Sequence, residues 1–252
     1  MSKDILKINN LTKRYGDKKA VDNISFSVKR GEIFGILGPN GAGKTTTLEM
    51  IETLRPIDSG RITIDGIDVA TKPNKIKKII GVQPQTPAFQ DKQKLGEIIE
   101  LFAASYGERV NAQELLEEVH LGDKINSYAE QVSGGQKQRL SIATALVHNP
   151  KVFFLDEPTT GLDPQARRNL WDLIRMIRDR GVTVIMTTHY LDEAELLCDR
   201  VAIMDNGKII ALDTPRNLIK QLLKRGFKKQ QHIEQANLDD VFIDLTGKAL
   251  RD

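Results

Sequence analysis

A glycine-rich segment with a single lysine is the first place along the chain where residue types and spacing predict chemistry. Residues 38–47 read GPNGAGKTTT and fit G-x-x-x-x-G-K-[ST], after an apolar run and before a stretch with a helical pattern. Glycines let backbone N–H groups converge on an anion, and the start of a helix adds partial positive charge. Lys44 suits the outer phosphates of a nucleoside triphosphate, and the Thr45 hydroxyl suits Mg²⁺. The predicted phosphate loop comprises Gly38, Pro39, Asn40, Gly41, Ala42, Gly43, Lys44, Thr45 and Thr46.

Two adjacent carboxylates could supply the chemistry that a bound triphosphate needs. The run KVFFLDEP at 151–158 predicts a buried strand that ends at Asp156 and Glu157. Asp156 is suited to hold Mg²⁺ through water, and Glu157 is suited to polarise the attacking water. The alternative is an acidic cluster at the start of a helix, without a chemical role.

The elements that must position these residues follow from the hydrophobic pattern. Strands are expected at 5–11, 22–28 and 32–37, with a hairpin over 61–69 that turns at Asp65–Gly66. A helix is expected over 44–55, after the glycine loop, with Leu48, Ile51 and Leu54 on one stripe. Residues 95–148 read as helices with little strand signal between them.

Strands and helices then alternate. Strands at 151–156 and 182–189 flank a helix that begins with Asp163 as N-cap and Pro164 at its first position and stops at Gly181. A hairpin follows at 201–212, and the chain then becomes more polar. This order predicts an α/β fold with a mainly parallel sheet, an antiparallel β subdomain and a helical lobe. We expect one domain over 1–212, with a helical subdomain at about 86–150, and a short helical tail over 213–252.

Composition excludes several classes of protein. The 252 residues carry 37 Lys+Arg and 34 Asp+Glu, a net charge of +3, so no strong field favours nucleic acid. Cys198 is the only cysteine, which rules out an internal disulfide, and the four histidines lack zinc-site spacing. The sequence has neither a signal-peptide core nor an apolar run long enough to cross a bilayer, so a cytoplasmic location is expected.

The order of the motifs resembles that of the ATPase subunits of ABC transporters. The phosphate loop is followed by QVSGGQKQRLSIATAL at 131–146, by FFLDEPTTGLD at 153–163 and by MTTH at 186–189. The resemblance runs from Leu6 to about Leu212 and implies a P-loop core with a helical signature subdomain. One departure is Val132, where the family usually has leucine; because valine keeps an apolar contact, we expect little effect.

The resemblance assigns roles to several further residues. Tyr15 is expected to stack on adenine, and His189 to contact the γ-phosphate. Gln85 is expected to reach Mg²⁺ and the attacking water, with the neighbouring Gln83 as the alternative for this role. Asp163 is expected to cross a dimer interface.

The signature segment implies a second anion site. Ser133 stands at the start of a helix, and the family uses this segment to face the γ-phosphate held by the other subunit. The residues concerned are Ser133, Gly134, Gly135 and Gln136.

The resemblance implies ATP hydrolysis that uses ATP and Mg²⁺. It implies two subunits paired head to tail, which bind separate integral membrane permease subunits at the inner face of the cell membrane. A homodimer is expected, with a related ATPase as the other possible partner. The stretch at 159–215 and the ending LDDVFIDLTGKALRD resemble the branch that exports drugs, antibiotics and polysaccharides.

The sequence argues against two other functions. The first is a ribosome- or nucleic-acid-associated ATPase. A single cassette, no room for a coiled coil, no basic stripe and 5% aromatic residues argue against it, and no nucleic acid is expected. The second is a regulator with a dead site, which Lys44, Ser133, Glu157 and His189 argue against.

Overall fold

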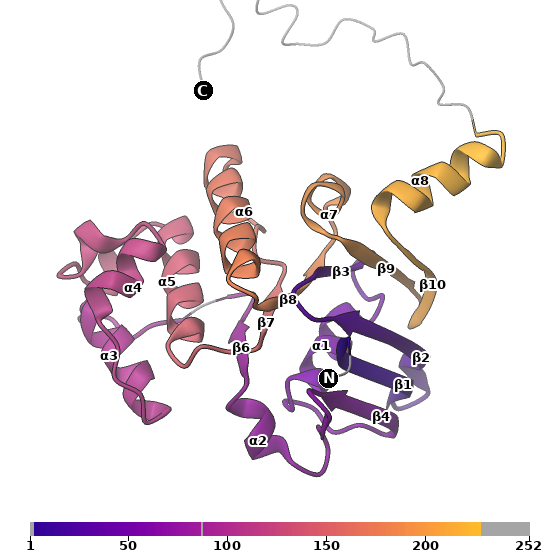
Figure 1. Ribbon diagram of the computed structural model, residues 1–252, viewed down its shortest axis with the longest axis horizontal. Helices are drawn as coiled ribbons and strands as arrows, with labels where there is room; N and C mark the ends of the chain where they lie inside the picture. Colours follow the sequence, from indigo (N-terminus) through magenta and orange to yellow (C-terminus); the bar gives the residue numbers. More distant parts are fainter. Residues whose placement is uncertain (1–2, 87, 228–252) are drawn as a thin grey trace, which may run out of the picture. The chain divides into compact units, whose positions relative to one another are not determined.

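The computed structural model of the chain describes residues 3–86 and 88–227. The chain divides into two compact units, Met1–Leu218 and Ile219–Asp252. The predicted phosphate loop, carboxylate pair and signature segment all lie in the first unit, which is shown in Figure 1. The ending at 238–252, on which part of the exporter resemblance rests, lies outside the described residues.

The first unit is built on a six-stranded sheet in the order β10-β9-β3-β8-β7-β6. Its strands are β3 (Ile33–Leu37), β6 (Ile80–Gln83), β7 (Val152–Asp156), β8 (Thr183–Thr188), β9 (Arg200–Asp205) and β10 (Lys208–Asp213). All neighbours are parallel except β9 and β10, which form the predicted hairpin. Leu37 pairs with Thr188, and Asp156 pairs with Thr187, so β3, β7 and β8 end at the same edge. The segments that carry the predicted site follow directly from this edge.

A second, antiparallel sheet has the order β2-β1-β4-β5. Its strands are β1 (Asp4–Tyr15), β2 (Lys18–Lys29), β4 (Ser59–Ile64) and β5 (Ile67–Asp68). The turn between β4 and β5 uses left-handed backbone at Asp65 (φ 51°) and Gly66 (φ 76°), which confirms the predicted hairpin. Tyr15 is the last residue of β1.

Helices cover both faces of the six-stranded sheet. The helices of the described residues are α1 (Lys44–Ile51), α2 (Pro73–Lys77), α3 (Leu95–Ser105), α4 (Ala112–Glu118), α5 (Gly134–Leu146), α6 (Pro164–Asp179), α7 (Leu191–Leu197) and α8 (Pro215–Lys224), with 3₁₀ turns η1 (Gly122–Lys124) and η2 (Ala129–Gln131). Helices α3, α4 and α5 confirm the helical character predicted for 95–148. Within the described residues, no helix is long and apolar enough to cross a bilayer.

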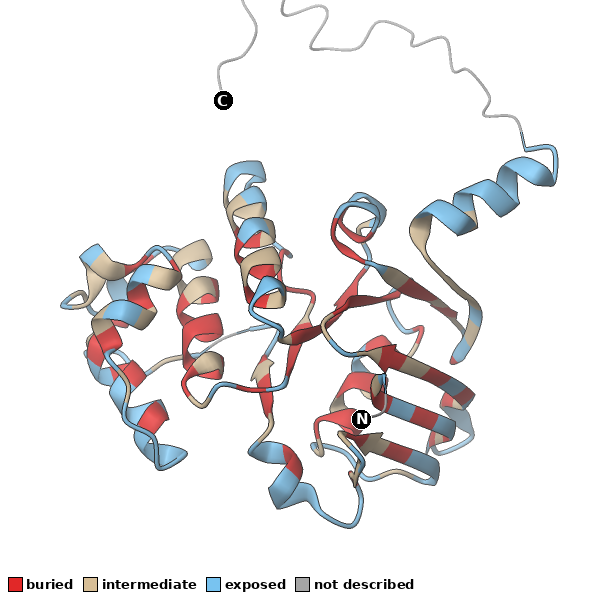
Figure 2. Ribbon diagram, in the orientation of Figure 1, coloured by how far each residue is buried: buried red, intermediate tan, exposed pale blue. Residues whose placement is uncertain are grey.

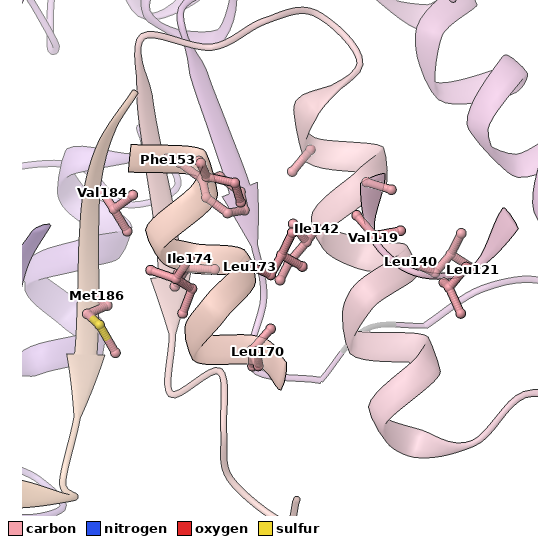
Figure 3. Close-up of a cluster of buried hydrophobic side chains, with 14 of the residues drawn as sticks. Val119, Leu121, Leu140, Ile142, Phe153, Leu170, Leu173, Ile174, Val184 and Met186 are labelled. Atoms are coloured by element: carbon pink, nitrogen blue, oxygen red, sulfur yellow. The ribbon is translucent and has the colours of Figure 1, made fainter. Parts of the chain in front are cut away.

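Two hydrophobic clusters follow from the alternation of side chains along the buried strands. Phe153 of β7 belongs to the cluster that includes α5 and α6, whereas Phe154 belongs to the cluster that includes α1 and the antiparallel sheet. Figure 3 shows Leu173 and Ile174 of α6 between Val184 of β8 and the signature helix α5. The strands of the six-stranded sheet are mostly buried in Figure 2, as expected for a sheet covered on both faces.

One expectation about α1 is wrong. Leu48 and Ile51 share the buried side of the helix, but the helix ends at Ile51 rather than at 55, and Leu54 is 63% exposed. Thr53 adopts left-handed backbone (φ 67°), which turns the chain away before the stripe is completed.

The predicted ends of α6 are confirmed. The Asp163 carboxylate accepts a hydrogen bond from the backbone N–H of Ala166 at 2.8 Å, and Pro164 occupies the first helical position. Gly181 follows the helix with φ 88°.

Candidate active site

The phosphate loop joins the end of β3 to the start of α1, the strand–loop–helix context that its pattern requires. A Cβ atom on Gly38 would lie 2.1 Å from the carbonyl oxygen of Met204. Gly43 has φ 103°, and a Cβ there would lie 2.3 Å from the carbonyl oxygen of Ala20. Any larger residue at these two positions would displace β9 or β2, so the loop can pass here only as glycine.

Lys44 is 4% exposed and is held by the loop and by the carboxylate of Glu157. Its ammonium donates to the carbonyl oxygens of Gly38 at 2.8 Å and Pro39 at 3.3 Å. The distance from Nζ to Oε1 of Glu157 is 3.2 Å. Because a buried ammonium is stable only with such partners, the lysine is fixed at the loop.

Glu157 is the point at which the predicted catalytic residues meet. Its Oε2 lies 3.2 Å from Nδ1 of His189 and accepts from the Gln85 amide at 3.4 Å and from the Thr160 hydroxyl at 3.4 Å. Together with Lys44, these contacts bring four segments of the chain to one carboxylate. A base in this position is within reach of a water molecule placed for attack.

The backbone at Glu157 is strained. Its φ is 47°, in the left-handed region that glutamate rarely adopts, at a cost of about 1–3 kcal/mol. The Glu157 N–H donates to the carbonyl oxygen of Thr187 at 3.2 Å and to its hydroxyl at 3.0 Å. Strand β8 therefore holds the turn that directs the carboxylate toward Lys44.

Asp156 lies beside the phosphate loop with a chemistry that fits Mg²⁺. Its Oδ1 accepts from the Thr187 hydroxyl at 2.5 Å and from the Thr45 hydroxyl at 3.4 Å. Burial raises the pKa of Asp156; the Thr187 hydrogen bond lowers it, and the charge of Glu157 raises it further. A hydroxyl, a carboxylate and the amide oxygen of Gln85 are the hard oxygen ligands that Mg²⁺ prefers.

The residues described contain no cluster of three His, Cys, Asp or Glu side chains that could hold a metal unaided. The fit to Mg²⁺ is therefore that of a site completed by water and phosphate oxygens, as is usual for this ion.

A cleft of about 680 Å³ collects most of the predicted nucleotide residues. The predicted site residues that line it are Tyr15, Asn40, Gly41, Gly43, Lys44, Thr45, Thr46, Gln85, Glu157 and His189. Sequence reasoning missed Lys18, Ala20 and Thr160, which also line it. Lys18 is the first residue of the strand that follows Tyr15, and Thr160 lies three residues after Glu157. Their closeness in sequence to predicted site residues is the feature that could have identified them.

The structure distinguishes the two glutamines that compete for one role. Gln83 is 1% exposed, and its amide donates to the side chain of Gln138 and to the carbonyl oxygen of Pro84 at 2.9 Å. Gln85 instead lines the cleft and contacts Glu157. The geometry favours Gln85 for contact with the nucleotide.

The signature segment and Asp163 lie elsewhere. They line a separate cleft of about 390 Å³, which includes Ser133, Gly134, Gly135, Gln136 and Asp163. Ser133 caps α5: its hydroxyl accepts from the Gln136 N–H at 3.3 Å, and its own N–H donates to the Gln136 side chain at 2.8 Å. Within one chain, the two groups of predicted residues therefore face two different clefts.

Another cleft of comparable volume lies away from the phosphate loop. A cleft of about 550 Å³ lies among Arg30, Asn111, Lys151 and Arg180 and contains none of the predicted site residues. The chemistry is concentrated in the cleft at the phosphate loop.

A glycine loop at a strand end, a lysine inside it and two carboxylates at the end of another parallel strand of the same sheet define a P-loop nucleotide hydrolase. The chain belongs to the ABC transporter family, whose sequence profile matches residues 21–160, and it is an ATP-binding, ATP-hydrolysing member of that family.

Two characterised relatives are similar over most of their length. The linearmycin resistance ATP-binding protein LnrL of Bacillus subtilis is 42% identical over 223 residues, which cover 86% of this chain and 72% of the relative. The Nod factor export ATP-binding protein I of Burkholderia orbicola is 43% identical over 225 residues, covering 87% and 74%.

Solved structures agree with the sequence relatives. An ATP-binding cassette of an ABC transporter in its ADP conformation has a TM-score of 0.80 at 28% identity and covers 88% of this chain and 96% of its own. The cbiO1 protein of Clostridium perfringens, part of the ABC transporter complex cbiONQ, has a TM-score of 0.78 at 29% identity, covering 89% and 94%.

Proposed function

We propose that this chain is the ATP-hydrolysing subunit of an exporter, and that two copies pair head to tail with an ATP molecule in each of two shared sites. The observation that carries the proposal is the division of the motif residues between two clefts. Lys44, Gln85, Glu157 and His189 line one, while Ser133 and Asp163 line the other. Head-to-tail pairing would bring the first cleft of each copy to the second cleft of its partner.

In the first cleft each side chain has a task set by its chemistry. The loop N–H groups and Lys44 bind the phosphates, and Tyr15 offers a ring to the base. Glu157 accepts a proton from the attacking water, and His189 and Gln85 orient the carboxylate and the water. Thr45, Asp156 and Gln85 would hold Mg²⁺, which when bound would neutralise charge on the outer phosphates.

In the second cleft the start of α5 offers backbone N–H groups and a helix dipole to the γ-phosphate of the facing copy. ATP would then lie between the copies and hold them together, and hydrolysis would release them. Such a two-state pair can drive a separate machine.

The partner that the pair drives is proposed to be an integral membrane permease, and the pair would bind it at the inner face of the membrane. Export is proposed because the relatives are named for linearmycin resistance, daunorubicin resistance and Nod factor export. No side chain of the nucleotide cleft contacts a transported molecule in this scheme, so the permease would set its identity.

The test is to replace Glu157→Gln and measure molar mass by light scattering with ATP and Mg²⁺. Without the base, hydrolysis should fall by about 10²–10⁴-fold, and the ATP-bound pair should persist. Glu100→Gln, at an exposed position of α3, is the matched control and should behave as the wild type. A Glu157→Gln variant that binds ATP but stays monomeric would contradict the paired arrangement.

A further inference from the structure

Two cations lie near the ring of Tyr15 at the nucleotide cleft. The Arg55 guanidinium carbon lies 5.7 Å from the centre of the Tyr15 ring, and Nζ of Lys13 lies 5.8 Å from it. Tyr15 is 43% exposed and lines the cleft together with the phosphate loop. Attraction between a cation and an aromatic ring extends to about 6 Å, so both contacts can restrain the ring.

Both cations are themselves anchored. The Arg55 guanidinium pairs with the Glu49 carboxylate through Nε and, at 3.3 Å, through a second nitrogen. Lys13 is buried and donates to Asp58 at 2.6 Å, while the Arg14 N–H donates to the other oxygen of Asp58 at 2.7 Å. The side chains around Tyr15 therefore have fixed partners of their own.

The two cations differ in what they connect. Lys13 belongs to β1, the strand that ends at Tyr15, and its ion pair with Asp58 lies within the antiparallel sheet region. Glu49 belongs to α1, the helix that begins at Lys44 of the phosphate loop. The path Glu49–Arg55–Tyr15 thus connects the helix of the phosphate site to the aromatic ring at the rim.

We propose that Arg55 is a positioning residue for base recognition: anchored to α1 by Glu49, it fixes the Tyr15 ring so that the ring is presented to the adenine of a nucleotide whose phosphates are bound at Lys44. This inference rests on the proposed function of the cleft. A free tyrosine at a strand end would have to be ordered when the base binds, which lowers affinity, whereas a ring already held avoids that cost. Stacking of a base on an aromatic ring then contributes its full favourable energy.

The alternative role for Arg55 is a surface ion pair with Glu49 alone. Such pairs contribute little, and removing one would not change how the protein distinguishes ligands with a base from ligands without one. Inorganic tripolyphosphate offers the phosphates without the base, so comparing it with ATP separates the two roles.

The experiment measures the dissociation constants of ATP and of tripolyphosphate, each with Mg²⁺, by calorimetry on the full chain. For Arg55→Ala we expect ATP binding to weaken about two- to fivefold, with tripolyphosphate binding unchanged. Tyr15→Ala should weaken ATP binding by about tenfold or more. In the double variant, loss of Arg55 should have no further effect, since the ring on which it acts is gone.

Arg61→Ala is the matched control. Arg61 is an exposed arginine of the antiparallel sheet, paired with Asp68 at 2.7 Å, and its loss should change neither constant. Arg55→Lys, which keeps the charge, should recover part of the ATP affinity.

Three results would overturn the inference: unchanged ATP affinity in Arg55→Ala, an equal loss for both ligands, or additive losses in the double variant. Failure of the proposed function would be recognised separately. In that case the wild type would bind neither ligand, or Lys44→Ala would bind both as the wild type does.

Discussion

At the scale of single residues, the candidate site depends on how buried charges are matched. The Lys44 ammonium and the Glu157 carboxylate are both almost inaccessible and lie 3.2 Å apart, so each stabilises the charge of the other. Each of the two side chains also has other partners. Glu157 also contacts Gln85 and His189, and Lys44 also binds two loop carbonyl groups. Removal of either residue would leave an unmatched buried charge beside the phosphate loop.

Glu52 is a buried carboxyl at the end of α1, and the part of the chain that the structure describes forms no ion pair with it. Burial, followed by the charges of Asp156 and Glu49, raises the pKa of Glu52 to about 8. The group therefore keeps its proton in the folded chain at pH values at which the unfolded chain has lost it. Because the folded state binds more protons between about pH 4.5 and 8, its stability falls as pH rises through that range.

A Glu52→Gln variant should lack this pH dependence. Relative to the wild type, we expect its free energy of unfolding to increase by on the order of 3 kcal/mol between pH 5.5 and pH 8. Urea unfolding at the two pH values measures the difference. Parallel behaviour of the two proteins across this range would show that Glu52 titrates normally.

At the scale of the elements, α6 packs on the face of the six-stranded sheet whose strands lead into the candidate site. Leu173 is buried between β8 and α5 (Figure 3), so Leu173→Ala should leave a cavity and lower the free energy of unfolding by about 2–5 kcal/mol. Leu196→Ala on α7, where the leucine is exposed, should change it by less than about 0.5 kcal/mol. Denaturant titration measures both variants, and equal losses would mean that burial at 173 is unimportant.

The elements also show what could be predicted from sequence and what could not. Alternation of strands and helices predicted the parallel sheet, whose strands β3, β7 and β8 end at one edge. The segments that follow these strands bring Lys44, Glu157 and His189 together. Periodicity failed at Leu54, because a single left-handed residue, Thr53, ends the helix early and periodicity carries no signal for it.

Other features depend on tertiary contacts alone. The preference for Gln85 over Gln83 rests on the burial of Gln83 against Gln138, a residue 55 positions away. The sequence did not predict a role for Arg55, because its contact with Tyr15 forms only when folding brings the end of β1 to the segment that follows α1.

At the scale of the whole molecule, the proposed partner is a membrane protein. Purification of the tagged chain from its native cells in mild detergent should recover an integral membrane protein in nearly equal amount. A tagged Lys44→Ala chain is a useful control, because Lys44 lies in the nucleotide cleft and its loss should remove ATP binding. Recovery of ribosomal proteins or nucleic acid in place of a membrane protein would refute the transport role, yet leave the nucleotide site as described.

The separation of Lys44 and Ser133 into two clefts has a genetic consequence if the copies pair as proposed. Consider a cell that makes two defective versions of the chain, one damaged at the phosphate loop and the other at the signature segment. In a mixed pair, one shared site receives both defects and the other receives neither. Two alleles that are each inactive alone would thus complement one another, whereas two alleles damaged in the same cleft would not.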